Sequence, residues 1–399
     1  MPAVEIKPQV YWIGVNDRTT DLFEGLWPIS EEGVSYNTYI IKDKKNAVID
    51  LVKSLKADTF LDQIDEVIPL SKLDYLIINH MEPDHTGMLR TLSRIVPDVT
   101  IIGTPKSKDM IKAFYGISEN IKIVEDGEQL ELGEKTLTFY HAPFVHWPET
   151  MVTYVNQDHI LFSCDAFGSY GALRGAIFDD EYENQAFYEK EALRYYVNIV
   201  ANFSKPVLNA IETLSSLDIE VIAPSHGLIW RQNPSRIVEL YKKWAEYATG
   251  ETEPGVTLLY GTMYGNTEEM MNEVANGISS AGIPVHIFDV SRIHVSYILS
   301  SLWTQKGVMI GAPTYEGKLF PSMKQVLEMA AHKHIRNKVC AYFGSYGWSG
   351  GALREIKKIA EAMNWEFFDS LPFPGGVDKK LLSQGRMLGK KFAEQVSRK

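Results

Sequence analysis

The sequence predicts an α/β protein built from two successive domains, and three observations carry that prediction. Up to about residue 245, the chain holds many short apolar strands separated by polar turns. After residue 255, brief apolar strands alternate with segments of helical length. Between the two regions, the segment ATGETEPGVT at 248–257 is rich in Gly, Pro, Thr and Glu and has no apolar periodicity, which is typical of a linker. We therefore expect domains at 1–250 and 255–399.

The strands of the first region follow one another closely, and several show the two-residue alternation of half-buried strands. Helices are expected around 186–204 and 234–248, so this region should form a sheet-rich layered structure with helices outside it. The expected strands are VYWIGV, YNTYII, AVIDLV, DYLIIN, VTIIGT, LTFYHA, MVTYVN and HILFSC.

The second region predicts a different sheet. Alternation of strands with helix-length segments implies parallel strands joined by crossover helices, and hence a doubly wound sheet of five strands. The expected strands are VTLLY, PVHIF, GVMIG, KVCAYF and EFF.

Composition excludes several classes of protein. The formal charge of −11 argues against a nucleic-acid surface, which needs clustered Lys and Arg. No run of 18 apolar residues exists, so we expect no membrane span, and MPAVEIKPQVYW lacks the pattern of a secretion signal. Cys164 and Cys340 lie far apart without a CxxC pair, which favours a reducing cytoplasm and no disulfide framework.

The stretch INHMEPDH, residues 78–85, places two histidines and two carboxylates within six residues after an apolar strand. Ligands commonly bind at the carboxyl ends of strands in α/β sheets. We expect Pro83 to keep this segment from forming a helix, so that His80, Glu82, Asp84 and His85 lie on a loop. Carboxylate oxygens and imidazole nitrogens suit iron, manganese or zinc better than copper(I).

Three more residues of the ligand type stand at predicted strand ends: His146, Asp165 and His226, the last followed by Gly227. Seven donors exceed the need of one ion, so two ions about 3.5–4 Å apart and bridged by a carboxylate fit better. A polar cap is the better explanation for any single member, but the coincidence of all seven favours a metal site. We expect the remaining histidines to be structural or solvent-facing: His141, His159, His286, His294, His332 and His334.

Three loops of the second region combine glycine with aromatic or polar residues, each after a predicted strand: GTMYGNTEEM, GAPTYEGKLFP and FGSYGWSGGA. The first opens a helix, whose amide groups can bind a phosphate, although an ordinary capped helix is the alternative. Glycine permits close approach of a flat ring, and aromatic side chains offer stacking surfaces. The candidate residues are Thr262, Met263, Tyr264, Gly265, Asn266, Thr267, Pro313, Thr314, Tyr315, Gly317, Ser345, Tyr346, Gly347, Trp348 and Gly350.

These motifs resemble a known family. The ligand series is similar to the metallo-β-lactamase fold, whose hydrolases carry H-x-H-x-D-H, but Glu82 stands where that pattern has its second histidine. With that replacement the series resembles the flavodiiron proteins, or A-type flavoproteins, over essentially the whole chain. The half from 255 onward resembles flavodoxin. The resemblance implies an αββα sandwich followed by a flavodoxin-like domain that binds FMN.

The resemblance also implies roles for the residues. His80, Glu82, His146 and Asp165 would hold one iron, and Asp84, His85 and His226 the other, with Asp165 bridging. Whether His85 binds iron stays open, because in some family members this histidine does not coordinate. Tyr195 and Tyr196, in EALRYYVNIV, are candidates for a hydrogen-bond donor behind the ligands, with core packing as the alternative.

The leading hypothesis is an enzyme in which FMN passes electrons to two irons that reduce NO to N₂O, O₂ to water, or both. A dizinc hydrolase with a flavodoxin regulatory domain is the alternative, and a non-enzymatic electron carrier is a third class. Because the chain ends at VSRK without a Cys-rich module, we expect an external donor, by resemblance a rubredoxin. The resemblance also implies a head-to-tail homodimer, or a dimer of such dimers.

Overall fold

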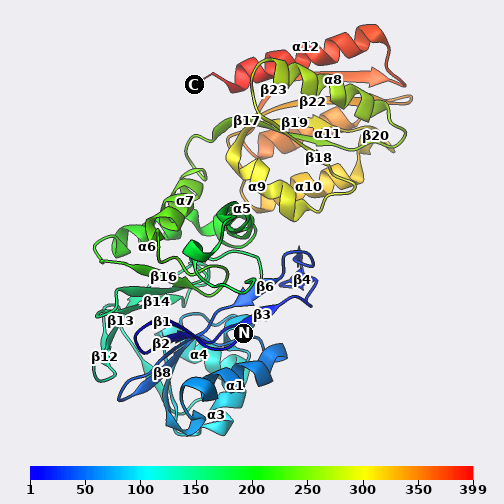
Figure 1. Ribbon diagram of the computed structural model, residues 1–399. Helices are drawn as coiled ribbons and strands as arrows, with labels where there is room; N and C mark the ends of the chain where they lie inside the picture. The colour runs from blue at the N-terminus through cyan, green and yellow to red at the C-terminus, as the bar shows by residue number, and fades with distance from the viewer. Residues whose placement is uncertain (399) are drawn as a thin grey trace. The chain divides into compact units, whose positions relative to one another are not determined.

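The structure, a computed structural model, describes residues 1–398 and divides into two compact units, Met1–Ala245 and the chain from Glu246 onward. Each unit is an α/β domain with its own sheets and helices (Figure 1). We call them the N-domain and the C-domain.

The N-domain is built on two sheets. The first has the strand order β1-β2-β7-β8-β9-β10-β11, and the second has the order β12-β13-β14-β15-β16. Strands β8, β9 and β10 run parallel to one another, as do β15 and β16. The first sheet comprises β1 (Val4–Lys7), β2 (Val10–Trp12), β7 (Tyr39–Ile41), β8 (Asn46–Ile49), β9 (Leu73–Ile77), β10 (Thr100–Gly103) and β11 (Ile121–Ile123). The second comprises β12 (Gln129–Glu131), β13 (Thr136–His141), β14 (Met151–Val155), β15 (Ile160–Cys164) and β16 (Val221–Pro224).

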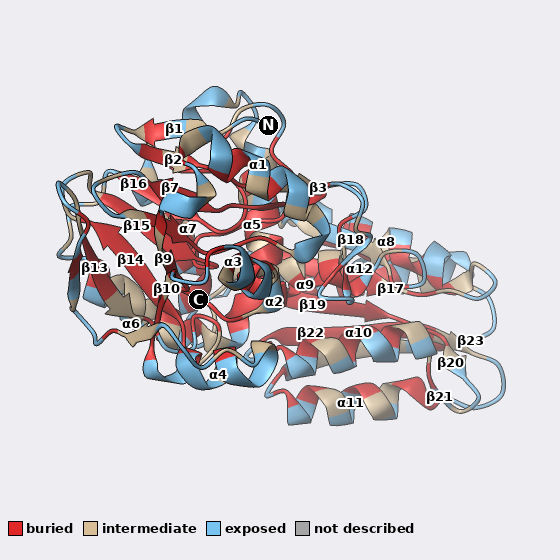
Figure 2. Cartoon of the chain, turned by 90° about the horizontal axis from the view of Figure 1, so that it is seen from below, coloured by how far each residue is buried: buried red, intermediate tan, exposed pale blue. Residues whose placement is uncertain are grey.

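Helices cover the outer faces of these sheets, which gives four layers (Figure 1). In Figure 2 the strands are largely buried while the outer helices show one exposed side, as expected of amphipathic helices packed on a sheet. The helices are α1 (Ala57–Val67), α2 (Pro83–Thr86), α3 (Leu89–Ile95), α4 (Pro105–Tyr115), α5 (Gln185–Tyr195), α6 (Ser204–Leu214) and α7 (Pro234–Glu246). Two small ribbons complete the domain, β3 (Val15–Asp17) with β6 (Val34–Tyr36), and β4 (Leu22–Phe23) with β5 (Trp27–Pro28).

All eight strands predicted for this region form, but the prediction for Pro83 was wrong. Pro83 does not block a helix; it is the first residue of the short helix α2, which carries Asp84 and His85. Proline is tolerated there because the first turn of a helix leaves its N–H groups unpaired in any case.

The C-domain has one parallel sheet in the order β18-β17-β19-β22-β23, which confirms the predicted doubly wound arrangement. Helices α8 and α12 pack on one face and α9, α10 and α11 on the other (Figure 1). The strands are β17 (Glu253–Tyr260), β18 (Val285–Asp289), β19 (Gln305–Gly311), β22 (Val339–Tyr346) and β23 (Glu366–Pro374), with a small ribbon of β20 (Thr314–Tyr315) and β21 (Lys318–Leu319). The helices are α8 (Asn266–Ser280), α9 (Val295–Thr304), α10 (Pro321–His332), α11 (Ala352–Ala362) and α12 (Lys379–Val396).

Two further expectations concern the whole chain. Cys164 and Cys340 are both buried and unpaired. Within residues 1–398, no helix combines the length and the apolar character needed to cross a bilayer.

Hydrogen bonds of the Asn37 side chain connect the loop before β7 to the end of β16. Its side-chain amide donates to the carbonyls of Pro224 and Gly227, both at 2.9 Å, and its Oδ1 accepts from Trp12 Nε1 at 3.0 Å. All these groups are buried, so the side chain satisfies polar atoms that water does not reach.

We predict that Asn37→Ala lowers the free energy of unfolding of the N-domain by about 2–4 kcal/mol, because it leaves several buried polar groups unpaired. Urea unfolding measures the change. The control is Ser215→Ala, which removes an exposed hydrogen bond to the backbone carbonyl of Glu212 in the same domain and should change stability by less than about 0.5 kcal/mol. Equal losses in the two variants would contradict this role of Asn37.

Candidate metal centre and flavin-binding loops

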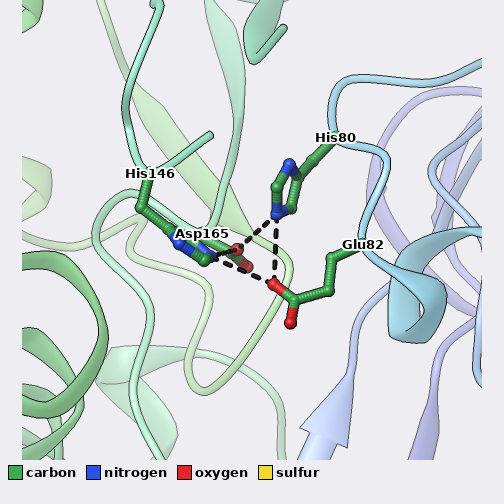
Figure 3. Close-up of side chains that lie close together, drawn as sticks. All are labelled: His80, Glu82, His146 and Asp165. Carbon is green, nitrogen blue, oxygen red and sulfur yellow. Dashed lines mark hydrogen bonds and ion pairs between the residues drawn. The ribbon is translucent and has the colours of Figure 1, made fainter. Parts of the chain in front are cut away.

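The seven candidate ligands of the N-domain come from four places in the sequence and meet at the carboxyl ends of the strands. His80, Glu82, Asp84 and His85 follow β9, His146 precedes β14, Asp165 follows β15 and His226 follows β16. They form two groups, His80–Glu82–His146–Asp165 and Asp84–His85–His226, and in each group one donor atom per residue lies within 4.8 Å of the others. Figure 3 shows the side chains of the first group converging.

Asp165 faces both groups at once. Its Oδ2 lies 3.1 Å from His146 Nε2 and 3.4 Å from His80 Nε2. Its Oδ1 lies 3.0 Å from His85 Nε2 and 3.4 Å from His226 Nε2. One oxygen therefore faces each group, which is the arrangement of a carboxylate that bridges two metal ions.

The remaining carboxylates each belong to one group. Glu82 Oε2 lies 3.3 Å from His80 Nε2 and 3.2 Å from His146 Nε2. Asp84 places one oxygen 3.5 Å from His85 Nε2 and the other 3.5 Å from His226 Nε2. All four histidines thus present the same ring nitrogen, Nε2, to the centre.

Many of these donor atoms are buried without a hydrogen-bond partner among residues 1–398. They are Asp84 Oδ1 and Oδ2, His85 Nε2, His146 Nε2, Asp165 Oδ1 and His226 Nε2. Buried polar atoms are rarely left unpaired, and donor atoms on a common metal ion with bonds of about 2.1 Å at right angles lie about 3 Å apart. The spacing and the unpaired atoms both fit metal ligands.

The buried carboxylates and histidines of the centre shift one another's pKa values towards the charged forms. Burial disfavours the charged form of a histidine, but the carboxylates outweigh it and raise the pKa of His146 to about 9 and that of His226 to about 10. Burial likewise disfavours charged carboxylates, but the histidines hold the pKa of Asp165 and of Glu82 below their ordinary values. Glu82 and Asp165 are therefore ionised, as carboxylate ligands of a metal must be.

Two residues that the sequence did not single out orient the histidines from behind. The Nδ1 atom of His80 lies 2.9 Å from Glu149 Oε1, and this oxygen also accepts the backbone N–H of Met81 at 2.9 Å. The Nδ1 atom of His226 donates to the backbone carbonyl of Ser35 at 2.7 Å. Burial disfavours protonation of His80, but the hydrogen bond to Glu149 raises its pKa well above the ordinary value.

Aromatic rings enclose the second group. Tyr195, Phe23 and Tyr36 have ring centroids 5.5–5.6 Å from that of His226. Among residues 1–398, the buried hydroxyls of Tyr36 and Tyr195 have no hydrogen-bond partner. Burial, followed by the charge of Asp165, raises the pKa of Tyr195 well above its ordinary value, so the hydroxyl keeps its proton.

The side chains of Tyr195 and Tyr196 point in different directions, as those of neighbouring residues on a helix do. Tyr195 ends α5 and faces the metal centre, whereas the Tyr196 hydroxyl lies 2.7 Å from Ser204 Oγ and its ring packs against Tyr241. A π-helical turn, Tyr196–Val200, follows directly, and such turns occur often at functional sites.

The β4–β5 hairpin brings one more acid to the centre. Glu24 is exposed, and the partial desolvation of its carboxyl and the negative charge of Glu82 raise its pKa above the ordinary value. Its backbone lies in the left-handed region, as does that of several other non-glycine residues in this part of the fold. Besides Glu24 (φ 51°), they include Asp50 (53°), Phe144 (65°), Cys164 (53°) and Phe167 (67°).

In the C-domain, the three predicted loops surround one pocket of about 330 Å³ at the ends of β17, β19 and β22. This is the switch point of the sheet, because β17 and β19 are neighbours from which the chain winds in opposite directions. The lining residues are Thr262, Met263, Tyr264, Asn266, Pro313, Thr314, Tyr315, Glu316, Ser345, Tyr346, Gly347, Trp348 and Gly375.

The pocket differs in detail from the sequence-based prediction. Gly265, Thr267, Gly317 and Gly350 do not line it, whereas Glu316 and Gly375 do. Gly265 instead shapes the first loop: it precedes α8 with φ 91°, and its N–H donates to Thr262 Oγ1 at 3.0 Å. Gly375 follows β23, in a loop that the sequence-based prediction did not include.

Comparisons with known proteins agree with this architecture. Residues 34–227 match the family described as "ODP family beta lactamase", and 258–385 match flavodoxin. Anaerobic nitric oxide reductase flavorubredoxins of Salmonella typhi and Escherichia coli are 35% identical over 98% of this chain and 82% of theirs. The chain belongs to the flavodiiron protein family.

Solved flavodiiron structures share the whole fold. The flavodiiron protein from Giardia intestinalis is 28% identical, with a TM-score of 0.94 over 99% of this chain and 97% of that chain. Rubredoxin oxygen:oxidoreductase from Desulfovibrio gigas is also 28% identical, with a TM-score of 0.92 over 99% and 98%. As a flavodiiron protein, the chain is an oxidoreductase whose cofactors are FMN and a non-haem diiron centre. The hydrolase alternative is not favoured.

We predict that Gly227→Ala destabilises the N-domain far more than Gly116→Ala. Both glycines have a positive φ, 80° and 71°, but a Cβ at Gly227 would lie 2.0 Å from Ser169 Oγ, whereas Gly116 faces open space. The backbone effect alone should cost about 1 kcal/mol, and the clash beside His226 about 2 kcal/mol more. Urea unfolding compares the two variants, and equal losses would show that the packing at Gly227 is unimportant.

We predict that Gly351→Ala weakens FMN binding without loss of metal from the N-domain. A Cβ at Gly351 would lie 1.9 Å from the carbonyl oxygen of Gly317, so the second and third flavin loops would separate. Gly282→Ala is the control, because it lies after the C-terminal end of α8 and its Cβ would meet nothing within 4 Å. Fluorescence titration of the flavin-free proteins with FMN measures both affinities. Unchanged affinity in Gly351→Ala would contradict the pocket assignment.

Proposed function

We propose that the two groups of the N-domain hold two irons, which reduce NO to N₂O, O₂ to water, or both, with electrons that arrive through FMN in the C-domain. His80, Glu82, His146 and Asp165 bind the first iron. Asp84, His85, His226 and the other oxygen of Asp165 bind the second. The observation that carries this proposal is the position of Asp165, whose two oxygens face different groups.

When bound, two ferrous ions and a reduced flavin would together supply four electrons for the reduction of a diatomic gas. Reduction of two NO to N₂O and water consumes two electrons and two protons, and reduction of O₂ to two water molecules consumes four of each. The hard oxygens of Glu82, Asp84 and Asp165 help to stabilise oxidised iron. Phe23, Tyr36 and Tyr195 limit the access of water from the side of His226.

Tyr195 is the candidate for a hydrogen-bond donor to a bound substrate. Its hydroxyl is buried, keeps its proton and has no partner among residues 1–398. Tyr196 serves in packing, because its hydroxyl is already engaged with Ser204.

For the C-domain, we propose that the loop at 262–267 binds the FMN phosphate at the start of α8, where the N–H groups of a helix favour an anion. The loops at 313–317 and 345–350 flank the isoalloxazine ring. Metal and flavin functions then correspond to domains 1–250 and 255–399, and the enzyme works in the cytoplasm with a rubredoxin-type donor.

We also propose a head-to-tail homodimer in which the flavin of one chain serves the irons of the other, or a dimer of such dimers. Exposed apolar side chains near both centres support this arrangement. In the N-domain these are Leu22, Leu26 and Phe144, and in the C-domain Met263, Tyr264, Tyr315 and Trp348. Exposed apolar side chains mark an interaction surface when they form a contiguous patch, and two-fold symmetry is the commonest closed assembly.

We predict about two irons per chain in protein from iron-replete cells, and rapid anaerobic reoxidation of the reduced protein by NO or O₂. Stopped-flow spectroscopy with identification of the product measures the reaction. Asp165→Ala should lose most of the iron, because it removes a ligand from both ions, while the control His332→Ala, at the exposed end of α10, should keep it. Two zincs per chain with hydrolase activity, or reduced protein that neither gas reoxidises, would contradict the proposal.

We predict that the protein sediments as at least a dimer of the 45.1 kDa chain. Leu26→Glu should shift it towards the monomer, because Leu26 is exposed on the hairpin beside the metal centre. Phe114→Glu is the matched control, since Phe114 is equally exposed but lies on α4. An active wild-type monomer would overturn the head-to-tail arrangement.

A further inference from the structure

The two metal-binding groups present the same kinds of donor. Each offers two histidine Nε2 atoms, one carboxylate of its own and one oxygen of the shared Asp165. Donor type alone therefore gives no reason for the two irons to differ. What differs is the set of groups that lie behind the histidines.

A buried negative charge lies next to the Nδ1 atom of His80. Glu149 Oε1 lies 2.9 Å from His80 Nδ1, and neither side chain is exposed. The same oxygen accepts the backbone N–H of Met81. Because a backbone N–H can only donate, this oxygen is an acceptor, and His80 Nδ1 carries the proton that it shares with Glu149. That tautomer leaves the Nε2 lone pair free for the metal.

Behind the second group, neither histidine is hydrogen-bonded to a charged residue. His226 Nδ1 donates to the neutral carbonyl of Ser35 at 2.7 Å. His85 Nδ1 is buried and has no hydrogen-bond partner among residues 1–398. The nearby acid Asp50 is also buried and interacts electrostatically with His85 and, less strongly, with His80, but its two oxygens accept hydrogen bonds from the backbone and the side chain of Asn79.

We propose that Glu149 makes the two irons electronically unequal, because it stabilises the ferric state of the iron bound by His80. A carboxylate that accepts the proton of a ligating imidazole raises the basicity of that ligand. Its charge also acts over a short distance in a buried site, where electrostatic effects are strong. Glu149 is a positioning residue that acts through His80. This inference rests on the proposed ligand set and extends it.

The consequence is an order of electron loss. With two irons bound, Glu149 would favour loss of the first electron from the iron held by His80. On reduction, it would favour arrival of the first electron at the iron held by His226. The half-oxidised pair would then carry its ferric ion on the His80 side of Asp165.

The test compares three variants of the iron-loaded holoprotein. Glu149→Gln keeps the size of the side chain and an oxygen for the Met81 N–H, but removes the charge. Glu149→Asp keeps the charge on a shorter side chain. Thr153→Val controls for the loss of a buried hydrogen bond, because Thr153 donates to Asn79 and makes no hydrogen bond to a candidate ligand.

A redox titration followed by EPR and Mössbauer spectroscopy gives the potentials of the two one-electron steps. In Glu149→Gln the two potentials should become more similar. The equilibrium constant for forming the half-oxidised pair from the diferrous and diferric pairs should therefore fall about tenfold, which corresponds to 59 mV for one electron. Glu149→Asp should recover part of the separation, and Thr153→Val should match the wild type. An unchanged separation in Glu149→Gln, or an equal shift of both steps, would overturn the inference.

Zinc titration of the metal-free proteins supplies a second measurement. Glu149→Gln should bind one of two zincs about 10–100-fold more weakly and the other with wild-type affinity. Equal weakening of both sites, or none, would overturn the inference while leaving the diiron proposal intact. A wild-type protein that binds fewer than two metals would instead overturn the proposed function, and this inference with it.

Discussion

The metal centre of the N-domain depends on the carboxylate of Asp165. Its side chain is almost fully buried, and a buried charge is tolerated only when it is paired or bound to metal. Four histidines from three distant parts of the chain place Nε2 within 3.0–3.4 Å of its two oxygens. The packing of the two sheets brings together the ends of β9, β15 and β16, and so creates this arrangement.

The two domains use the same architectural feature for different chemistry. In each, the functional groups lie at the carboxyl ends of parallel strands, where loops can vary while the sheet holds their ends in place. The N-domain supplies side-chain donors, made rigid by hydrogen bonds such as those of Glu149 and Ser35. The C-domain supplies loops rich in glycine and aromatic residues, which suit a flat ring and a phosphate. One domain thus holds metals and the other a flavin.

Sequence reasoning reached the residues whose signal is local. The spacing of His80, Glu82, Asp84 and His85 within six residues singled out the metal loop, and apolar periodicity gave the strands that carry it. The groups behind the ligands were not predictable in this way. Glu149 is 69 residues from His80, and Ser35 contributes a backbone carbonyl that any residue could offer. The role of Pro83 was misjudged because the same residue that breaks a helix interior also begins a helix.

The most direct test of the central claim is a crystal structure of the iron-loaded protein with anomalous diffraction at the iron edge. The account predicts two iron peaks per chain, about 3.5–4 Å apart, one bonded to Asp165 Oδ1 and the other to Asp165 Oδ2. A single peak, peaks at the zinc edge instead, or an Asp165 side chain that binds only one ion would contradict it.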